Sequence, residues 1–417
     1  MTERRKTVVR LLSAATLVAA ITLPGLYLLG AAEDTTWPSY RGPGLDGISS
    51  QTGLLKTWPE AGPKVLWKTP LGDGYSGITI AGKHVYTMYS TADGEFVACF
   101  NVADGVELWR VRLDDNRPDQ FGDGPRSTPT LDGDTVYALG ARGILMAVKA
   151  DTGATIWSKD LKAEFNAQVP RWGVSTSPLV EGDLVLVNAG GKPDGSLVAL
   201  DKKTGATRWK AYSDKPGYST PLPVDIQGVR QVLFFTGSSL VSVTPVDGKV
   251  LWSVPWKTSY HINAAMPVLV APDKVFVSSS YDTGAAVYQI KKSGDTWSTA
   301  EVWKSNVMKN HFNSSILHDG YLYGFDDKTL KCINALTGEE SWGHRGFAKG
   351  SLLLADGHLL VFSEEGLLAL VEATPSAYKE KARAQILEGR TWTMPSLADG
   401  TLYLRNQKEM VALDITG

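Results

Sequence analysis

The stretch Asp151-Thr152-Gly153-Ala154-Thr155-Ile156-Trp157 decides the fold, because its pattern of a turn and a strand ending in tryptophan recurs along the chain. An Asp or Thr side chain caps such a turn, and Gly supplies the positive φ that the turn needs. The phrase therefore predicts a hairpin whose tryptophan packs a large flat surface against a neighbouring unit. Further copies are Asp104-Gly105 with Trp109, Thr204-Gly205 with Trp209, Asp247-Gly248 with Trp252, Thr337-Gly338 with Trp342, and a degenerate copy, Ser293-Gly294 with Trp303.

Successive tryptophans of this pattern lie 39 to 52 residues apart, a period that is typical of four-stranded propeller blades. A second phrase lies between them: a hydroxyl residue, often before Pro, then an apolar pair and a Gly turn. Its clearest copies are Ser127-Thr128-Pro129, Ser177-Pro178 and Ser219-Thr220-Pro221. Helical periodicity is missing after the N-terminus, except that the charged stretch 378–387 is either a strand or an inserted helical turn. These patterns predict an all-β protein.

The two ends of the repeat region complete each other. The chain finishes with residues 412–417, the first half of the tryptophan phrase, whereas residues 62–67 form a second half with nothing before it. Pairing these N- and C-terminal strands would close a ring and remove its exposed sheet edges. With a degenerate copy after Trp342, we expect residues 62–417 to form a single eight-bladed β-propeller of four-stranded antiparallel blades, with seven blades as the alternative. The predicted structural tryptophans are Trp67, Trp109, Trp157, Trp209, Trp252, Trp303 and Trp342.

The N-terminus carries a targeting signal. Arg4, Arg5 and Lys6 precede an apolar run over residues 11–29, and small residues up to Ala32 suit signal-peptidase cleavage. Residues 1–32 are therefore a signal peptide or an uncleaved N-terminal anchor, because the run is also long enough to span a bilayer. Both alternatives place the protein outside the cytoplasm, in the periplasm or cell envelope, and the uncleaved segment would anchor it to the inner membrane. Residues 33–61 form an N-terminal extension.

Composition excludes some partners. The 42 basic and 44 acidic residues give a net charge of −2 and form no basic block in the body of the chain, so nucleic acid is not an expected partner. The two cysteines, Cys99 and Cys332, occupy the same position in two non-adjacent repeats. We expect both to be buried free thiols.

The repeated Asp/Ala-x-x-Thr-Gly-x-x-x-Trp phrase resembles that of the PQQ-repeat, quinoprotein-like and BamB-like β-propellers, over residues 62–417. One branch of this family comprises BamB-like scaffolds that bind protein. The other comprises dehydrogenases that hold the cofactor PQQ and Ca²⁺ on the propeller axis beside an Asp base. The segment 37–43, Trp-Pro-Ser-Tyr-Arg-Gly-Pro, resembles a leader of short PQQ-repeat proteins, and its Trp37 and Tyr40 could dock on the propeller surface.

The resemblance also implies that the loops entering each inner strand face the central channel. The ligand or channel-face candidates on these loops are Tyr75, Arg126, Arg171, Trp172, Tyr218, His261, Asn263, His311, Asn313, Lys349, Arg390 and Trp392. Trp172 or Trp392 could stack on a planar ligand, and the arginines could pair with carboxylates. The alternative is that these side chains simply line a wet channel mouth. His261 and His311 lie in neighbouring blades and could approach each other, but no metal-ligand spacing is present, so no metal site is expected.

The chemistry of the sequence favours a binding protein over an enzyme. It has neither the adjacent cysteines common in alcohol-oxidising quinoproteins nor a carboxylate-rich loop for Ca²⁺. Neither a Gly-x-Ser-x-Gly elbow nor a phosphate loop is present, and no catalytic residue is identified. We therefore expect a monomeric, exported, non-enzymatic propeller that binds protein partners in the envelope, needs no cofactor, and touches a membrane only through the possible anchor. The alternative is a PQQ-dependent oxidoreductase with PQQ and Ca²⁺ on the axis, for which carboxylates and an Asn should converge near Trp172 or Trp392.

Overall fold

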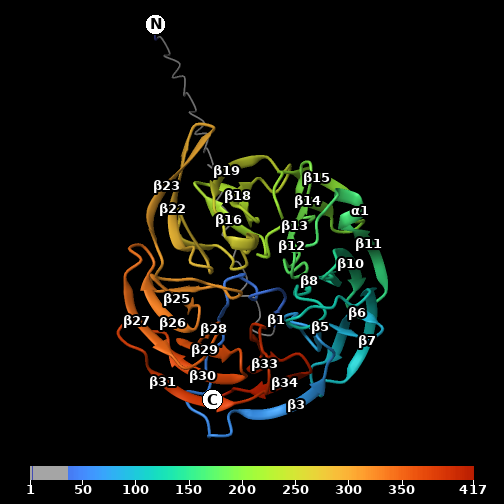
Figure 1. Ribbon diagram of the computed structural model, residues 1–417, viewed down its shortest axis with the longest axis vertical. Helices are drawn as coiled ribbons and strands as arrows, with labels where there is room; N and C mark the ends of the chain where they lie inside the picture. The colour runs from blue at the N-terminus through green and yellow to red at the C-terminus, as the bar shows by residue number, and fades with distance from the viewer. Residues whose placement is uncertain (1, 3–35) are drawn as a thin grey trace.

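Each copy of the tryptophan phrase forms the outer half of one antiparallel sheet, and eight such sheets form a ring in the computed structural model (Figure 1). The structure describes Thr2 and residues 36–417. The eight-bladed prediction is confirmed, and the seven-bladed alternative is wrong. The predicted signal peptide or anchor, residues 1–32, lies outside the described residues apart from Thr2. Among the described residues, no helix combines the length and apolar character needed to cross a membrane.

Every blade has four strands that run from the axis outward. The first four blades consist of β4 (Thr79–Ala81), β5 (His84–Thr91), β6 (Gly94–Asn101) and β7 (Glu107–Asp114); β8 (Thr130–Asp132), β9 (Thr135–Leu139), β10 (Ile144–Lys149) and β11 (Thr155–Asp160); β12 (Leu179–Glu181), β13 (Leu184–Gly191), β14 (Gly195–Asp201) and β15 (Thr207–Ala211); β16 (Leu222–Ile226), β17 (Val229–Phe235), β18 (Ser239–Val243) and β19 (Val250–Pro255).

The fifth to eighth blades consist of β20 (Val268–Ala271), β21 (Lys274–Ser279), β22 (Gly284–Ser293) and β23 (Thr296–Ser305); β24 (Ile316–His318), β25 (Tyr321–Asp326), β26 (Thr329–Asn334) and β27 (Glu340–Arg345); β28 (Gly350–Ala355), β29 (His358–Ser363), β30 (Leu367–Glu372) and β31 (Glu380–Gln385); β32 (Ser396–Ala398), β33 (Thr401–Arg405), β34 (Glu409–Asp414) and β3 (Lys64–Pro70). Two short helices lie between blades: α1 (Leu161–Phe165), which the sequence did not predict, and the 3₁₀ turn η1 (Ser259–His261). The charged stretch 378–387 contains β31, so its strand alternative is the correct one.

The ring closes as the sequence predicts, because β3 from the start of the chain pairs antiparallel with β34 from its end. The buried guanidinium of Arg405 strengthens this closure. It donates to the carbonyls of Met88 and Gly74 in or before the first blade, at 2.8 and 3.0 Å, and to the Thr87 hydroxyl at 3.1 Å. Burial lowers the pKa of Arg405 to about 10, but the guanidinium stays charged at neutral pH.

Six of the seven blade tryptophans bind the next blade in one way. Their indole N–H groups donate to backbone carbonyls of that blade at 2.8 to 3.2 Å, from Trp67, Trp109, Trp157, Trp209, Trp303 and Trp342. The indole ring also covers the turn glycine of that blade where the turn has one: a Cβ at Gly105, whose φ is +69°, would lie 2.6 Å from the Trp67 ring. The turn therefore needs Gly both for its backbone conformation and for its contact. Cys99 and Cys332 are buried and free, as predicted, each opposite a blade tryptophan in the register.

Two blades depart from this rule. Gly294 lies at the tip of the long β22–β23 hairpin, which extends from the ring in Figure 1, and nothing lies within 4 Å of the position of its Cβ. Ser293-Gly294 is thus a degenerate copy, as predicted: Trp303 keeps the tryptophan position opposite Val287, but the hairpin is lengthened beyond the rim, so no indole covers its turn glycine. In the seventh blade, Ala382 occupies the tryptophan position opposite Leu370.

The N-terminal extension runs through the ring rather than over its outer surface. β1 (Thr36–Trp37) pairs with the inner strand β4, and β2 (Ile48–Ser49) pairs in parallel with the inner strand β28. The connecting segment contacts other inner strands, since the Pro38 carbonyl accepts from Leu131 and Arg41 donates to the Ser315 carbonyl at 2.8 Å. Trp37 and Arg41 are only 2% and 3% exposed. The expectation that Trp37 and Tyr40 dock on the propeller surface is thus corrected: the segment plugs the axial channel.

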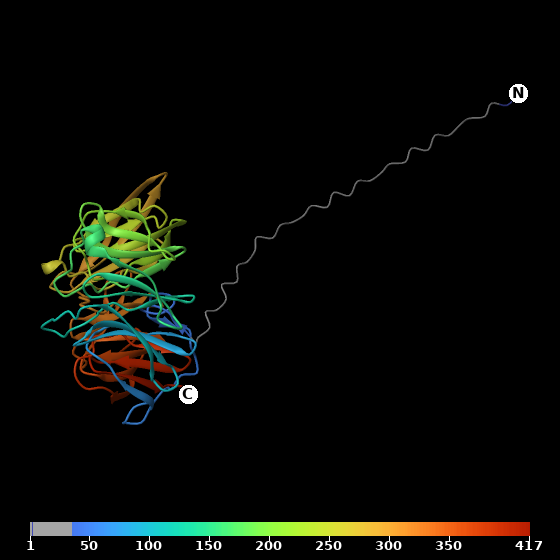
Figure 2. The ribbon, with the colours of Figure 1, turned by 90° about the vertical axis from the view of Figure 1, so that its right-hand side faces the viewer.

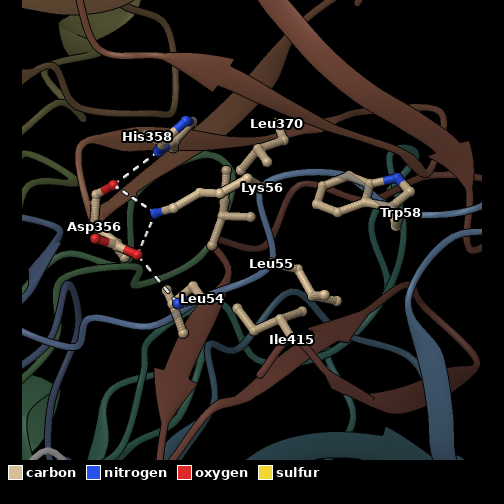
Figure 3. Close-up of a pocket in the computed structure, with 10 residues that line it drawn as sticks. Leu54, Leu55, Lys56, Trp58, Asp356, His358, Leu370 and Ile415 are labelled. Carbon is tan, nitrogen blue, oxygen red and sulfur yellow. Dashed lines mark hydrogen bonds and ion pairs between the residues drawn. The ribbon is translucent and has the colours of Figure 1, made fainter. Parts of the chain in front are cut away.

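After the plug, the extension crosses the seventh and eighth blades, where an ion pair between Lys56 and Asp356 fixes it (Figure 3). The Asp356 carboxylate also accepts from the Leu54 N–H at 3.1 Å. Leu54, Leu55, Trp58 and Ile415 surround a cavity of only about 10 Å³. That volume holds about one water molecule, so this contact is a structural tie.

Candidate functional site: the axial mouth

A concave site in which many aromatic and cationic groups converge lies at one end of the axis, where the loops between blades meet. We call it the mouth pocket; its volume is about 390 Å³. It is lined by aromatic residues (Tyr40, Tyr75, Phe121, Trp172, Tyr218, Tyr281, His311, Phe312, Trp392), by hydroxyl residues (Thr128, Ser175, Ser177, Thr220, Ser351, Thr393), by Arg126 and Lys349, and by Gly77, Ile262, Ala264 and Met394. In the side view, η1 projects on the face opposite the one from which the extension starts (Figure 2). Because Tyr260 of η1 packs on Trp172 in the lining of the mouth pocket, η1 marks the mouth. The mouth and the start of the plug are therefore at opposite ends of the channel.

The second sequence phrase builds the neck of the pocket. Its hydroxyl groups accept backbone N–H groups from the preceding blade: Thr128 from Gly77 at 3.1 Å, Ser177 from Thr128 at 2.9 Å, and Thr220 from Ser177 at 3.0 Å. These bonds satisfy backbone donors at the start of inner strands, where no ladder partner exists. Tyr40 of the plug also lines the pocket. Because the plug pairs with the inner strands β4 and β28, it occupies the channel behind the pocket.

Aromatic rings form the wall on the side of the eighth blade. Trp392 stacks with Tyr75, with ring centroids 5.2 Å apart and planes 29° apart, and packs on Phe312 at 5.1 Å and on Phe121 at 6.0 Å. Its indole N–H donates to a Glu364 carboxylate oxygen at 2.8 Å. That bond fixes the ring orientation, which leaves the wall preformed.

The opposite wall continues the aromatic lining. The ring centroid of Trp172 lies 6.2 Å from that of Tyr218 and 6.3 Å from that of Tyr260. The Tyr260 and Tyr281 centroids are also 6.3 Å apart. The ring centroid of His311 lies 5.4 Å from that of Tyr281 and 5.5 Å from that of Phe312. Aromatic contacts therefore extend around much of the mouth.

Three arginines support this lining. Arg126 is held by Asp119 at 3.6 Å and by the Gly122 carbonyl at 2.8 Å. The Arg390 guanidinium lies 4.6 Å from the centre of the Trp392 ring, and that of Arg171 lies 5.1 Å from the centre of the Trp172 ring. Such cation–π contacts hold positive charge at the mouth beside flat apolar surfaces.

A lysine, a histidine and a tyrosine form a hydrogen-bonded row in the wall. Lys349 Nζ lies 3.4 Å from His311 Nδ1, and His311 Nε2 lies 3.0 Å from the Tyr281 hydroxyl. Burial, together with the charge of Lys349, lowers the pKa of His311 to about 4, so the ring is neutral at neutral pH. A neutral ring whose Nδ1 accepts from an ammonium carries its proton on Nε2, which then donates to Tyr281. The only full charge in this row is that of Lys349.

The structure separates the predicted channel-face residues into three groups. Tyr75, Arg126, Trp172, Tyr218, His311, Lys349 and Trp392 line the pocket. Arg171 and Arg390 lie over its tryptophans. His261, Asn263 and Asn313 do not line it: His261 contacts Lys215 and the Gly237 carbonyl, while the two asparagines are buried and bind backbone carbonyls of Thr236, Trp256 and Gly350. The possible approach of His261 to His311 gives no shared site, because each has different partners.

Sequence reasoning missed several wall residues. Phe121 and Phe312 belong to interblade loops in which only polar and tryptophan residues were singled out. Tyr281 lies in the hairpin between the second and third strands of the fifth blade, which reaches the same face as the interblade loops. The signal that could have identified Tyr281 is the position of this hairpin, which lies on the mouth face of the ring.

The donor set of the pocket does not suit a divalent cation. Among the described residues that line it, none is Asp or Glu. Within residues 36–417, no group of three or more His, Cys, Asp or Glu side chains is placed to hold a metal ion. Ca²⁺ needs six to eight oxygen ligands, several of them carboxylates. Of the carboxylates and Asn expected near Trp172 or Trp392, Glu364 contacts Trp392, and its oxygens bind the Trp392 indole and the Lys349 backbone N–H. No Asp, Glu or Asn of the described residues lines the pocket.

Comparison with known proteins agrees with this fold. The family model described as "Outer membrane protein assembly factor BamB" matches residues 92–344, more than half of the chain. The outer membrane protein assembly factor BamB of Yersinia pestis is 22% identical over 346 residues, which cover 76% of this chain and 79% of that protein. The crystal structure of BamB from Moraxella catarrhalis superposes with a TM-score of 0.62 at 17% identity, covering 84% of this chain and 97% of that one. This structural likeness shows the fold alone.

A second kind of relative matches over a shorter segment. The quinoprotein alcohol dehydrogenase PedH of Pseudomonas putida is 29% identical over 140 residues, which cover 32% of this chain and 23% of that enzyme. The match is therefore to a set of repeats and not to a whole enzyme.

Proposed function

We propose, on the premise that the chain belongs to the family described as outer membrane protein assembly factor BamB, that it is an exported binding propeller whose mouth pocket holds a protein partner of the cell envelope. It acts as a monomeric scaffold, and no catalytic step is assigned to it. The N-terminal sequence supports export, since a basic start and an apolar run precede the propeller.

One observation carries this proposal: the mouth pocket is preformed, aromatic and cationic, and none of the described residues in its lining carries a carboxylate. Tryptophan, tyrosine and arginine are the residues that most often dominate the binding energy of protein interfaces. Here they gather in a concave site whose rings are already held by neighbours, which reduces the entropy lost on binding. The site offers no nucleophile beside a base that would indicate hydrolysis.

The test compares two tryptophans in the full-length chain. Wild-type protein, Trp392→Ala and Trp297→Ala are immobilised, and detergent-solubilised envelope of the source organism is passed over each. Trp297 lies on the projecting β22–β23 hairpin, away from the mouth, and serves as the matched control. We expect wild type and Trp297→Ala to retain the same envelope proteins, and Trp392→Ala to lose about tenfold or more of them. Equal retention by all three would show that the mouth is not the binding site.

A second candidate function is a quinoprotein oxidoreductase, favoured by the flat aromatic walls and by Arg126 and Lys349. PQQ is planar and carries three carboxylates, so the rings and cations suit its body. The Ca²⁺ that accompanies PQQ does not fit the residues here, because within residues 36–417 no carboxylate lines the pocket. This disagreement ranks the binding propeller above the dehydrogenase.

A titration with PQQ separates the two candidates. PQQ is added to the purified protein with and without Ca²⁺ while tryptophan fluorescence is followed, and an artificial electron acceptor is then supplied with simple alcohols and sugars. We expect no Ca²⁺-dependent quenching and no dye reduction. Saturable, Ca²⁺-dependent quenching together with dye reduction would replace the binding proposal by the oxidoreductase.

A further inference from the structure

Lys349 is a cation without a carboxylate partner in the part of the chain that the structure describes. Its Nζ has no Asp or Glu oxygen within 4 Å, and its hydrogen-bond partner is the neutral His311 ring at 3.4 Å. The other cation in the pocket lining, Arg126, contacts Asp119 at 3.6 Å. Two carboxylates lie near enough to act on its charge. Glu364 is already bound to the Trp392 indole and the Lys349 backbone N–H, and Asp327 accepts from the Ser280 hydroxyl and lies 3.8 Å from Lys309. The ammonium group can therefore accept an anionic ligand without breaking an ion pair.

The surroundings of Lys349 select which anion can bind. Phe312 joins His311 to Trp392, so the wall next to the ammonium is aromatic. A small hydrated anion would leave this surface exposed to water, whereas a flat apolar group beside the anion would cover it. The lining has no negative side chain that would attract a cationic ligand.

The plug determines how a ligand enters. Tyr40 lines the pocket, and the plug to which it belongs pairs with inner strands of the first and seventh blades, so a polymer cannot run through the channel. A volume of about 390 Å³ is near the lower end of the usual range for ligand pockets. The ligand must therefore enter end-first with a group no larger than a short terminal fragment.

We propose that the mouth pocket binds, end-first, a carboxylate attached to an aromatic or similarly flat group, with Lys349 pairing the carboxylate and Trp392 and Phe312 contacting the flat group. This inference rests on the proposed function and specifies the chemistry that its site recognises. The ligand has two sources with this chemistry: a polypeptide C-terminus whose last residue is aromatic, or a free aromatic acid.

The first experiment leaves the protein unchanged and varies one charge on the probe. Full-length protein is titrated calorimetrically with N-acetyl-Gly-Gly-Phe as the free acid and as the C-terminal amide. Because the carboxylate of the acid would form a charged hydrogen bond with Lys349, we expect the acid to bind about tenfold to a hundredfold more tightly than the amide. This difference in affinity should shrink as the salt concentration rises. Equal affinities, or no binding of the acid at millimolar concentration, would overturn the inference.

Two lysine variants locate the effect. In Lys349→Gln the acid should bind about tenfold more weakly and no better than the amide, whereas Lys68→Gln, on the exposed outer strand β3, should behave as wild type. Melting temperatures within about 2 °C of wild type establish that both variants are folded. Retained discrimination in Lys349→Gln would overturn the assignment of the carboxylate to Lys349.

A third probe, 3-phenylpropionate, distinguishes the two sources. Tighter binding of the peptide acid indicates a polypeptide terminus, and tighter binding of 3-phenylpropionate indicates a free acid; both results support the shared chemistry. If no acid binds while Trp392→Ala still loses the envelope proteins, the inference fails and the proposed function stands. If the acids bind and all variants retain envelope proteins equally, the proposed function fails and the pocket chemistry stands.

Discussion

The rim and the mouth of this propeller both use tryptophan, but they use it differently. At the rim, six indoles donate to the next blade in the same geometry, and five cover a turn glycine. At the mouth, Trp172 and Trp392 occupy no repeated position, and cations lie over their rings. The difference indicates that repeated tryptophans hold the ring together, whereas the aromatic and cationic walls of the mouth are formed by residues outside the tryptophan phrase.

The largest expected effect tests the rim. Trp209→Ala removes a buried ring and the 2.8 Å hydrogen bond to the Pro245 carbonyl, and it leaves a cavity between two blades. We expect the free energy of unfolding to fall by about 3–5 kcal/mol. Trp392→Ala at the more exposed mouth should cost about 1 kcal/mol. Guanidinium unfolding followed by far-UV circular dichroism measures both, and similar losses would contradict the division between rim and mouth.

The next effect concerns a buried carboxylate behind the mouth. Glu95 is 1% exposed and accepts from the Ala141 N–H at 2.9 Å. Burial raises its pKa from 4.5 to about 7. Between these values the folded state keeps a proton that the unfolded state has lost, so this group lowers stability as pH rises from about 4.5 to 7. The loss is at most about 3 kcal/mol.

Glu95→Gln isolates this contribution, because the amide oxygen can still accept from Ala141 but no longer titrates. The stability of the variant relative to wild type should increase between pH 4.5 and pH 8, by up to about 3 kcal/mol. Unfolding curves measured for both proteins across this pH range provide the test. A constant difference would mean that Glu95 does not hold its proton in the folded state.

A pair of glycine variants sharpens the definition of the rim. Both glycines have positive φ, +69° for Gly205 and +59° for Gly294, so Ala strains the backbone at both. At Gly205 the added Cβ would also lie 2.8 Å from the Trp157 ring, whereas at Gly294 it meets nothing within 4 Å. We expect Gly205→Ala to cost about 2–3 kcal/mol and Gly294→Ala about 1 kcal/mol in urea unfolding. Equal costs would show that the indole contact adds nothing to the backbone requirement.

The same comparison explains what the sequence could predict. The rim repeats, so one chain contains several copies of the Trp–Gly rule, and the eight blades, the closure by residues 62–70 and the buried cysteines follow from it. The aromatic and cationic walls of the mouth do not repeat, although the hydroxyl groups of its neck do. Asn263 and Asn313 look alike in sequence to pocket residues, but the paths of their loops turn them onto backbone carbonyls.

Two other features depended on contacts between distant residues. Tyr40 became the floor because β1 and β2 pair with inner strands of the first and seventh blades, and the extension carries no repeat that predicts this pairing. Tyr281 reaches the wall from a hairpin in which it and Asp282 both have positive φ, at +59° and +58°. Neither Tyr nor Asp prefers positive φ as strongly as glycine does, so a single sequence does not reveal this turn.

The smallest expected effect separates binding from stability at a single residue. Burial lowers the pKa of Lys349 despite the nearby carboxylates of Glu364 and Asp327, which means that the folded protein disfavours its charged form. Removing that charge should therefore leave the free energy of unfolding at pH 7 unchanged or slightly higher. Lys349→Gln should lose carboxylate affinity without losing stability, as expected for a charge kept for a ligand. A clear destabilisation measured by guanidinium unfolding would instead assign Lys349 to the structural scaffold, together with the residues of the rim.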